Sequence, residues 1–304
     1  MPIALIPEGL AGLRADLGVA RLFGVSRSQV EQACLVGDLQ MNGAVIDKAT
    51  KLQAGAMIEL ALTEPRAVEV RPALVGDLRI VFSDADLIVV DKPAGVAAHP
   101  SLGWEGPSVV EHLAAAGFAP CPAGPPERPG VVSRLDVGTS GLMVLARSVL
   151  AYDALKQAFT DHRVTKIYQA LVQGYPVPPA GTIDAPIGHV RTGEWKMMID
   201  QRRGRSAVTH YQTLERLAAS SLLRINLETG RTHQIRVHMA AVGHPLIGDT
   251  LYGADPTRAN LLKINRQWLH AVELSFDHPR SGDVMHFHSA PAGDLASALA
   301  QLRD

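Results

Sequence analysis

Asp136 is the residue of this sequence whose setting most clearly suits chemistry. It lies in the stretch VVSRLDVGTSGLMVLAR, residues 131–147, where glycines and hydroxyl residues separate two apolar runs. That pattern is typical of a tight turn between buried strands, which we predict at 131–132 and 142–146. A carboxylate among apolar neighbours is costly unless it is paired or used in a reaction. The stretch by itself leaves two interpretations open, a reactive carboxylate or a turn-capping residue paired with Arg134.

Resemblance to a known family favours the first interpretation. The stretch SRLDVGTSGL resembles the pattern HRLDxxTSGL of the RluA family of pseudouridine synthases. Four more stretches agree with that family in the same order: DKPAGVAAHP (91–100), KIYQALVQG (166–174), LETGRTHQIRVHMAAVGHPLIGDTLYG (227–253) and LHAVELSFDHP (269–279). The resemblance covers about residues 78–304. The chain departs from the pattern at Ser133, where the family has His, and this concerns a supporting contact, not the catalytic carboxylate.

The resemblance implies a reaction and three residues that carry it. Pseudouridine formation breaks the bond between ribose and a uracil nitrogen, turns the base and joins the ribose to carbon 5. This requires a carboxylate nucleophile, and the resemblance implies that Asp136 is that group. It also implies that Arg236 pairs with the carboxylate and keeps it ionised, and that Tyr168 stacks on the uracil and is a candidate for handling protons. The alternatives are a solvated helix arginine at 236 and a core tyrosine at 168.

Basic residues around these motifs are the predicted contacts with RNA. Residues 191–205 carry a net charge of +3 with Trp195 among them, which suits phosphate contacts beside a stacking group; an ordinary solvated loop is the alternative. Arg134 is expected to displace the target base or to hold a phosphate, and a simple ion pair is its alternative. The predicted RNA-binding residues are Lys92, Arg134, Arg202, Arg203, Arg205, Arg231, His233 and Arg27.

The composition bounds the remaining possibilities. The 304 residues are 47% hydrophobic and carry a net charge of −1, so a sizeable core can form and any RNA contact must come from local patches. No run of 18 apolar residues predicts a membrane span, and the N-terminus lacks the basic region of a signal peptide. Cys34 and Cys121 form no disulfide framework. We therefore expect a cytoplasmic protein that acts as a monomer.

We expect neither a metal nor a cofactor. His233 and His238 are five residues apart, which on a helix separates them by about 140°, whereas the usual helical zinc pair is four apart. The implied isomerisation needs no cofactor, and His99 and His270 are expected to be structural.

Residues 1–64 are predicted to form a small separate domain. A helix is expected over 11–23, and Ser26 with Gln29 forms a capping box that begins a second helix. Asn42-Gly43 predicts the turn of a hairpin. This order resembles the RNA-binding domain named after ribosomal protein S-four. Its five basic and seven acidic residues give a net charge of −2, so a domain that contacts protein is the alternative.

Residues 65–77 are expected to be a linker and 78–304 the catalytic domain. Strands are predicted at 78–82, 87–91, 164–172, 207–214, 222–227 and 268–276. Helices are predicted at 108–116, 149–159 and 295–302, and a loop that enters a helix is predicted over 229–242. The helix within 229–242 would bury Ile235, Met239 and Val242. Strands outnumber helices and few βαβ units occur, so we predict an α+β fold with a mixed, mostly antiparallel sheet, preceded by the small α/β RNA-binding-like domain.

The leading hypothesis is an enzyme that isomerises uridine to pseudouridine in structured RNA, with large-subunit ribosomal RNA as the substrate that the resemblance implies. A competing class is a non-catalytic RNA-binding ribosome assembly factor with a degenerate synthase domain. The presence of Asp136, Tyr168 and Arg236 together argues against that class. A metal-dependent hydrolase is a third class, and it would require the histidines to converge.

Overall fold

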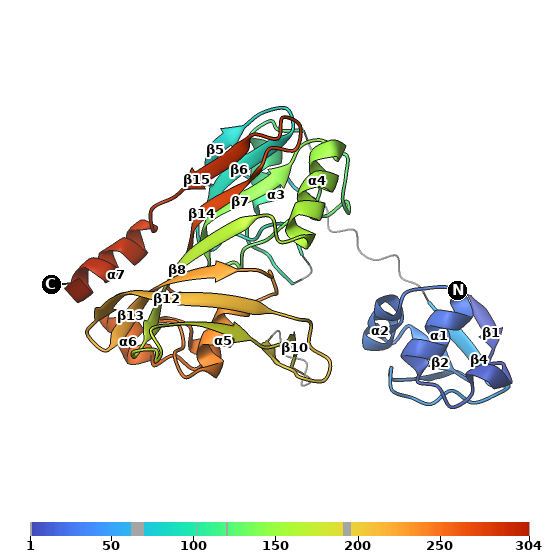
Figure 1. Cartoon of the computed structure of the whole chain (residues 1–304). Coiled ribbons are helices and arrows are strands. Elements are labelled where there is room, and N and C mark those ends of the chain that lie inside the picture. The colour runs from blue at the N-terminus through green and yellow to red at the C-terminus, as the bar shows by residue number, and fades with distance from the viewer. Residues whose placement is uncertain (1, 62–69, 102, 120, 191–195, 304) are drawn as a thin grey trace. The chain divides into compact units, whose positions relative to one another are not determined.

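The structure is a computed structural model, and it describes residues 2–61, 70–101, 103–119, 121–190 and 196–303. The chain divides into two compact units, residues 1–67 and 68–304 (Figure 1). No helix among the described residues is both long enough and apolar enough to cross a membrane.

The first unit packs two helices against a small antiparallel sheet. Its elements are β1 (Ile3–Leu5), the 3-10 helix η1 (Glu8–Leu10), α1 (Ala15–Phe23), α2 (Arg27–Val36), β2 (Leu39–Met41), β3 (Ala44–Val45) and β4 (Met57–Leu60). The sheet order is β1-β4-β2-β3. The predicted capping box is confirmed, since Ser26 and Gln29 bond each other's backbone at the start of α2. The predicted hairpin is also confirmed, with positive φ at Asn42 and Gly43.

The second unit is built on a nine-stranded sheet. Eight of its strands lie in the order β5 (Arg79–Ser83), β6 (Leu87–Lys92), β7 (Ser140–Ala146), β14 (Leu269–Asp277), β8 (Thr165–Gln173), β13 (Ser220–Leu227), β12 (Val208–Leu217) and β9 (Ala180–Asp184). The ninth, β15 (Val284–His288), pairs with the later part of β14. Of the pairings between these strands only β7 with β14 is parallel. The predicted mixed, mostly antiparallel sheet is confirmed.

The remaining elements surround this sheet. They are α3 (Val109–Ala115), α4 (Val149–Thr160), the two-stranded ribbon β10 (Ile187–His189) and β11 (Met197–Ile199), α5 (Gln234–Ala241), the 3-10 helix η2 (Thr250–Tyr252), α6 (Pro256–Leu261) and α7 (Gly293–Arg303). Serines cap two of these helices as short polar side chains at N-caps do: Ser108 accepts from the backbone of α3, and Ser148 from that of α4.

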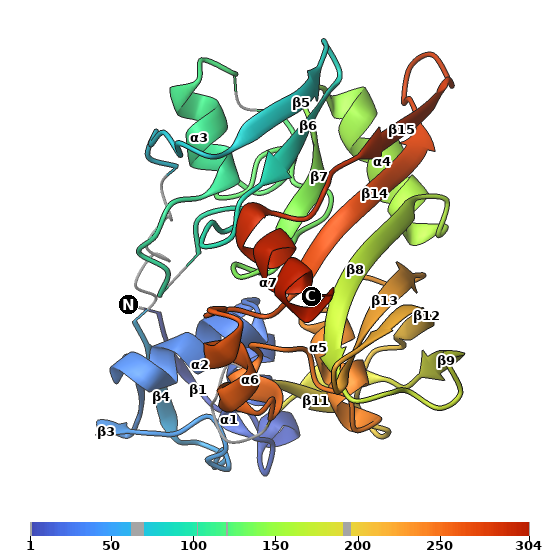
Figure 2. The same cartoon turned by 90° about the vertical axis from the view of Figure 1, so that its left-hand side faces the viewer.

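Alternating side chains on β6 and β7 face two different cores. One set packs with α3 and comprises Ile88, Val90, Met143 and Leu145. The other packs with α4 and comprises Leu87, Val89, Leu142, Val144 and Ala146. Because successive strand residues point to opposite faces, α3 and α4 cover opposite faces of these strands, as Figure 2 shows. This burial on both faces explains why the two strands read as nearly continuous apolar runs.

α5 lies on the face that carries α3. Its Ile235 and Met239 pack with Tyr168 of β8 and Ile225 of β13 in the same core. The expectation that Val242 is buried is wrong, because α5 ends at Ala241 and Val242 is 44% exposed. α5 therefore presents a shorter apolar stripe to the sheet than its sequence predicted.

Two further predictions need correction. Residues 131–132 do not form a strand, because Val131 makes only an isolated bridge to Leu145. The later part of the predicted linker belongs to the second unit, since Val75 donates its backbone N–H to Nδ1 of His112 at 3.0 Å. The earlier linker residues 65–69 lie outside the described residues.

Candidate active site

Asp136 lies in a turn directly before β7, at the edge of a pocket. Its backbone carbonyl accepts a hydrogen bond from Thr139 N–H at 3.0 Å, which closes the turn predicted from the sequence. Its side chain is 17% exposed, so the carboxylate is partly shielded and still open to a ligand. The residues that line the pocket are Arg134, Leu135, Asp136, Thr139, Tyr168, Leu227, Gly230, Arg231, Thr232, His233, Gln234, Ile235, Arg236 and Leu269.

A buried lysine holds one side of this turn. Lys92 is fully buried, and its ammonium donates to the carbonyls of Pro93 at 2.9 Å, Val96 at 2.7 Å and Val137 at 3.4 Å. The carbonyl of Val137 also accepts from the Gly95 N–H at 2.8 Å. The prediction that Lys92 contacts RNA is therefore wrong, because its amino group is buried and donates hydrogen bonds to backbone carbonyls inside the protein. Burial lowers the pKa of Lys92 to about 7.

The segment before β14 holds the other side of the turn. Arg266 donates from Nη1 to the carbonyl of Gly138 at 3.0 Å, and Gln267 donates to the Thr139 hydroxyl at 3.2 Å. The approach is close at Gly138, where an added Cβ would lie 2.5 Å from the Gln267 amide oxygen and would displace that side chain. Asp294 in turn fixes Arg266 through two bonds of 2.7 and 2.8 Å. The turn that carries Asp136 is thus clamped by elements far away in the sequence.

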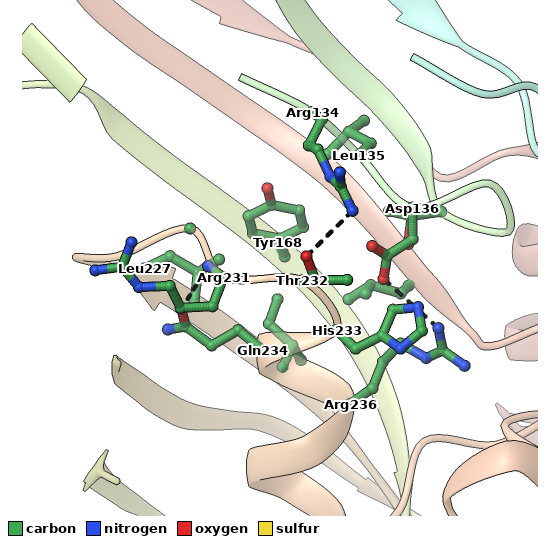
Figure 3. Close-up of a pocket in the computed structure, with 14 residues that line it drawn as sticks. Arg134, Leu135, Asp136, Tyr168, Leu227, Arg231, Thr232, His233, Gln234 and Arg236 are labelled. Atoms are coloured by element: carbon green, nitrogen blue, oxygen red, sulfur yellow. Dashed lines mark hydrogen bonds and ion pairs between the residues drawn. The ribbon is translucent and has the colours of Figure 1, made fainter. Parts of the chain in front are cut away.

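Arg236 reaches the carboxylate of Asp136 from the first turns of α5. Its Nη1 lies 3.6 Å from Oδ2 of Asp136, and its side chain is only 9% exposed (Figure 3). The two short bonds of Arg236 go to another carboxylate: Nε and Nη2 donate to Asp249 at 2.6 and 2.8 Å. Burial acts to lower the pKa of Arg236, but the bonds and charge of Asp249 with the charge of Asp136 raise it overall. The guanidinium therefore remains charged and serves two carboxylates.

Tyr168 faces the same pocket from the middle of β8. It is buried, and its hydroxyl has no hydrogen-bond partner within the described part of the chain. Burial, with the negative charge of Asp136, raises the pKa of Tyr168, so the phenol keeps its proton at neutral pH. The alternative of a core tyrosine with a bonded hydroxyl does not describe this environment.

His233 begins α5 in a left-handed backbone conformation, with φ of 57°. Its Nδ1 lies 2.8 Å from the hydroxyl of Tyr252, and the two rings meet edge to face. That hydroxyl also accepts the backbone N–H of Met197 at 3.0 Å. The ring of Tyr252 lies under the guanidinium of Arg236, at 4.9 Å. Tyr252 thus connects β11 to two residues of the pocket.

Basic residues lie along the rim of the pocket. Arg134 is exposed and donates to the Thr232 hydroxyl at 3.1 Å, and Arg231 donates to the Ser206 carbonyl at 2.9 Å. Neither makes a salt bridge with a described residue. Lys166 does not line the pocket and was not predicted to contact RNA, but it lies two positions before Tyr168 in β8. Burial and the charge of Arg231 lower the pKa of Lys166 to about 8. Among the residues that the structure describes, these cations have no carboxylate partner, and they suit an anionic ligand.

The other predicted RNA contacts are not part of the pocket. Arg202, Arg203 and Arg205 are exposed on the segment after β11, where Asp200 accepts the backbone N–H of the first two. Arg27 lies in the first unit and pairs at 2.5 Å with Asp16, which is fully buried and also bonds Arg14. Its charge is therefore largely committed within its own unit.

The histidines do not converge, and part of the predicted basic stretch lies outside the described residues. Arg191, Glu194 and Trp195 lie outside the described residues. His238 is buried against Thr209 and the carbonyl of Ala185, away from the contact that His233 makes with Tyr252. Among the residues that the structure describes, no group of three potential metal ligands is gathered.

Sequence reasoning missed Asp249 and Tyr252. Asp249 follows the apolar run HPLIG, and the argument that singled out Asp136 applies to it too, since a carboxylate beside an apolar run needs a partner. No local pattern singles out Tyr252. Its role depends on contacts with β11 and α5, which only the tertiary structure brings together.

Comparison with known proteins adds a second line of evidence. The family described as RNA pseudouridylate synthase matches residues 86–241. An uncharacterised RNA pseudouridine synthase of Mycobacterium tuberculosis is 50% identical over 98% of this chain and 97% of its own length. Ribosomal large subunit pseudouridine synthase D of Vibrio cholerae is 38% identical over 98% of this chain and 94% of its own. The solved structure of human RNA pseudouridylate synthase domain containing 4 is similar with a TM-score of 0.58 at 26% identity, covering 74% of this chain and 92% of that one.

Proposed function

Because the chain belongs to the RNA pseudouridylate synthase family, we propose that it isomerises uridine to pseudouridine in large-subunit ribosomal RNA, with Asp136 as its catalytic carboxylate. The observation that best supports this role is the meeting of Asp136, Tyr168 and Arg236 in one pocket. They come from a turn, a strand and a helix, and their assembly is what a carboxylate-dependent reaction on a flat base requires.

The reaction can be written with the residues of the pocket. The bond from C1′ of the ribose to N1 of uracil breaks, and a bond from C1′ to C5 forms. C5 loses a proton and N1 gains one, so the nucleotide neither gains nor loses atoms. Asp136 supplies the nucleophile, Arg236 holds its oxygen, and Tyr168 offers a flat ring on which the base stacks. Arg134 and Arg231, at the rim, are suited to the phosphates beside an everted nucleotide.

The choice of substrate follows from named relatives. Several of them, from Vibrio cholerae and Pseudomonas aeruginosa among others, are called ribosomal large subunit pseudouridine synthase D. We extend that substrate to this chain, and a ribosomal RNA substrate implies that the protein acts in the cytoplasm. RNA binding by residues 1–64 stays a prediction, as does the monomeric state.

The experiment compares pseudouridine maps of cellular RNA with and without this chain, and then restores either the parent or Asp136→Asn. The amide is nearly isosteric with the carboxylate and cannot act as an ionised nucleophile. We expect the parent to restore one or more pseudouridines in large-subunit RNA, while the variant restores none and binds RNA with about the parent's affinity. A variant that restores the modification would refute the role of Asp136, and unchanged maps would favour a non-catalytic assembly factor.

A further inference from the structure

We propose that Tyr252 holds His233 as the tautomer with its proton on Nε2, and that this N–H is a donor that the pocket offers to a carbonyl oxygen of the target uracil. His233 then touches the substrate, whereas Tyr252 acts through His233 as a positioning residue. This inference rests on the proposed function and adds a contact to the base.

The hydrogen bonds of the Tyr252 hydroxyl determine the tautomer. A backbone N–H can only donate, so the bond from Met197 uses the phenolic oxygen as acceptor. The hydroxyl's own proton then needs an acceptor, and Nδ1 of His233 at 2.8 Å is its other partner. If Nδ1 carried a proton instead, the hydroxyl proton of this half-buried tyrosine would lack an acceptor among the described residues. Nδ1 is therefore the acceptor, and a neutral ring carries its proton on Nε2.

The ring is neutral at pH 7 and fixed in place. Burial lowers the pKa of His233, and the charge of Arg236 acts in the same direction against that of Asp136. The left-handed backbone at the start of α5 and the edge-to-face contact with Tyr252 fix the ring. Nε2 has no partner in the part of the chain that the structure describes. His233 lines the pocket together with Asp136, and Figure 3 shows its ring on the side of the pocket facing that carboxylate.

A neutral donor at this place suits the reaction. When the bond between C1′ and N1 breaks, its electron pair remains on the uracil and the negative charge spreads to O2 and O4. The base then uses an electron pair at C5 to bond C1′, C5 releases its proton, and N1 becomes protonated. An N–H that is already oriented stabilises the charged oxygens without transferring a proton. The guanidinium nitrogens of Arg236 already contact two carboxylates. Nε2 of His233 has no partner among the described residues, so its N–H is available to the uracil.

Three substitutions at His233 separate this donor from other effects. His233→Ala removes both nitrogens. His233→Gln places an amide N–H near the position of Nε2, whereas His233→Asn places one near Nδ1. Asn tolerates a left-handed backbone better than Gln does. A recovery with Gln but not with Asn therefore cannot arise from backbone strain, and it would identify the Nε2 donor.

The measurement is the single-turnover rate at saturating RNA, on a fragment that the parent modifies, together with the dissociation constant. We expect His233→Ala to lower the rate about 100-fold while the dissociation constant changes by less than about threefold. His233→Gln should regain about tenfold of this loss, and His233→Asn none. Rates for His233→Ala within twofold of the parent, or equal rates for Gln and Asn, would overturn the contact with the base.

The tautomer is tested without substrate. In the nitrogen-15 spectrum of histidine-labelled protein, assigned by comparison with His233→Gln, we expect the parent to show a protonated Nε2 and a bare Nδ1. Tyr252→Phe should shift this towards a mixture and lower the single-turnover rate about fivefold, since one oriented donor is only partly lost. A proton on Nδ1 in the parent would overturn the inference. A parent that makes no pseudouridine in any ribosomal fragment would instead defeat the proposed function and the base contact with it, while the spectrum still decides the tautomer.

Discussion

The guanidinium of Arg236 forms its two short bonds with Asp249, at 2.6 and 2.8 Å, and approaches Asp136 with its remaining nitrogen at 3.6 Å. Asp249 is almost fully buried and thereby sets the plane of the guanidinium. A bidentate carboxylate fixes an arginine in position and direction more firmly than a single contact does. Arg236 can therefore point one nitrogen at the catalytic carboxylate, because a second carboxylate holds the other two.

Asp249→Asn should lower both activity and stability. The amide keeps the shape of the side chain but leaves Arg236 without its charged partner in a buried site. We expect a single-turnover rate about 100-fold lower and a free energy of unfolding lower by about 3 kcal/mol. Single-turnover kinetics and urea denaturation measure the two effects. Asp277→Asn, at an exposed carboxylate, is the control and should change neither quantity. A single-turnover rate of Asp249→Asn near that of the parent would mean that the two bonds from Asp249 do not position Arg236.

Lys92 should couple stability to pH. Its pKa falls from the ordinary value of 10.5 to about 7 because it is buried, although the charge of Asp136 opposes the shift. Between these two values the unfolded chain binds the proton and the folded chain releases it, so stability rises with pH. The free energy of unfolding of the parent relative to Lys92→Met should increase from pH 7 to pH 9, by at most about 1.4 kcal/mol per pH unit. A difference that stays flat or falls over this interval would contradict this titration.

Lys166 should make RNA binding depend on pH near 8. Burial, with the neighbouring charge of Arg231, lowers the pKa of Lys166 to about 8, so the ammonium is charged below that pH and neutral above it. We expect affinity for RNA to weaken as pH rises from 7 to 9, because one phosphate partner loses its charge. Lys166→Met should bind more weakly at pH 7 and lose most of this dependence. The exposed Lys156 offers a matched control, since Lys156→Met should retain the parent's pH profile; identical profiles for all three proteins would exclude Lys166 as a contact.

The salt dependence of binding should separate the two groups of arginines predicted to contact RNA. Arg202, Arg203 and Arg205 are exposed, whereas Arg27 is paired with buried Asp16. Replacing the first three with Gln should reduce the slope of log affinity against log salt by up to about 2 for single-stranded RNA. Arg27→Gln should leave the slope nearly unchanged. Binding isotherms at several salt concentrations give both slopes, and a larger effect at Arg27 would show that the first unit carries the main electrostatic contact.

The sequence by itself determined the features that depend on local spacing. The hydroxyl and glycine residues after Asp136 specify a turn before a buried strand, wherever that strand packs. The bonds between Ser26 and Gln29, and the positive φ at Asn42-Gly43, are likewise satisfied within a few residues. The apolar run over residues 142–146 likewise predicted the buried strand β7. The family motifs added Arg236 and Tyr168 to the site, which spacing alone could not connect to a turn 32 or 100 residues away.

Only the tertiary structure decided how the charges are partnered. The sequence analysis predicts that Lys92 contacts RNA, yet packing against the turn of Asp136 buries it among carbonyls. Arg236 has two carboxylates within reach. Asp249, in the segment that follows α5, accepts its two shorter bonds. Tyr252 joins β11 to His233 through a single hydroxyl. The sequence does not encode such partners directly, because the energy of a buried charge or hydrogen bond depends on groups that meet only after distant segments have packed.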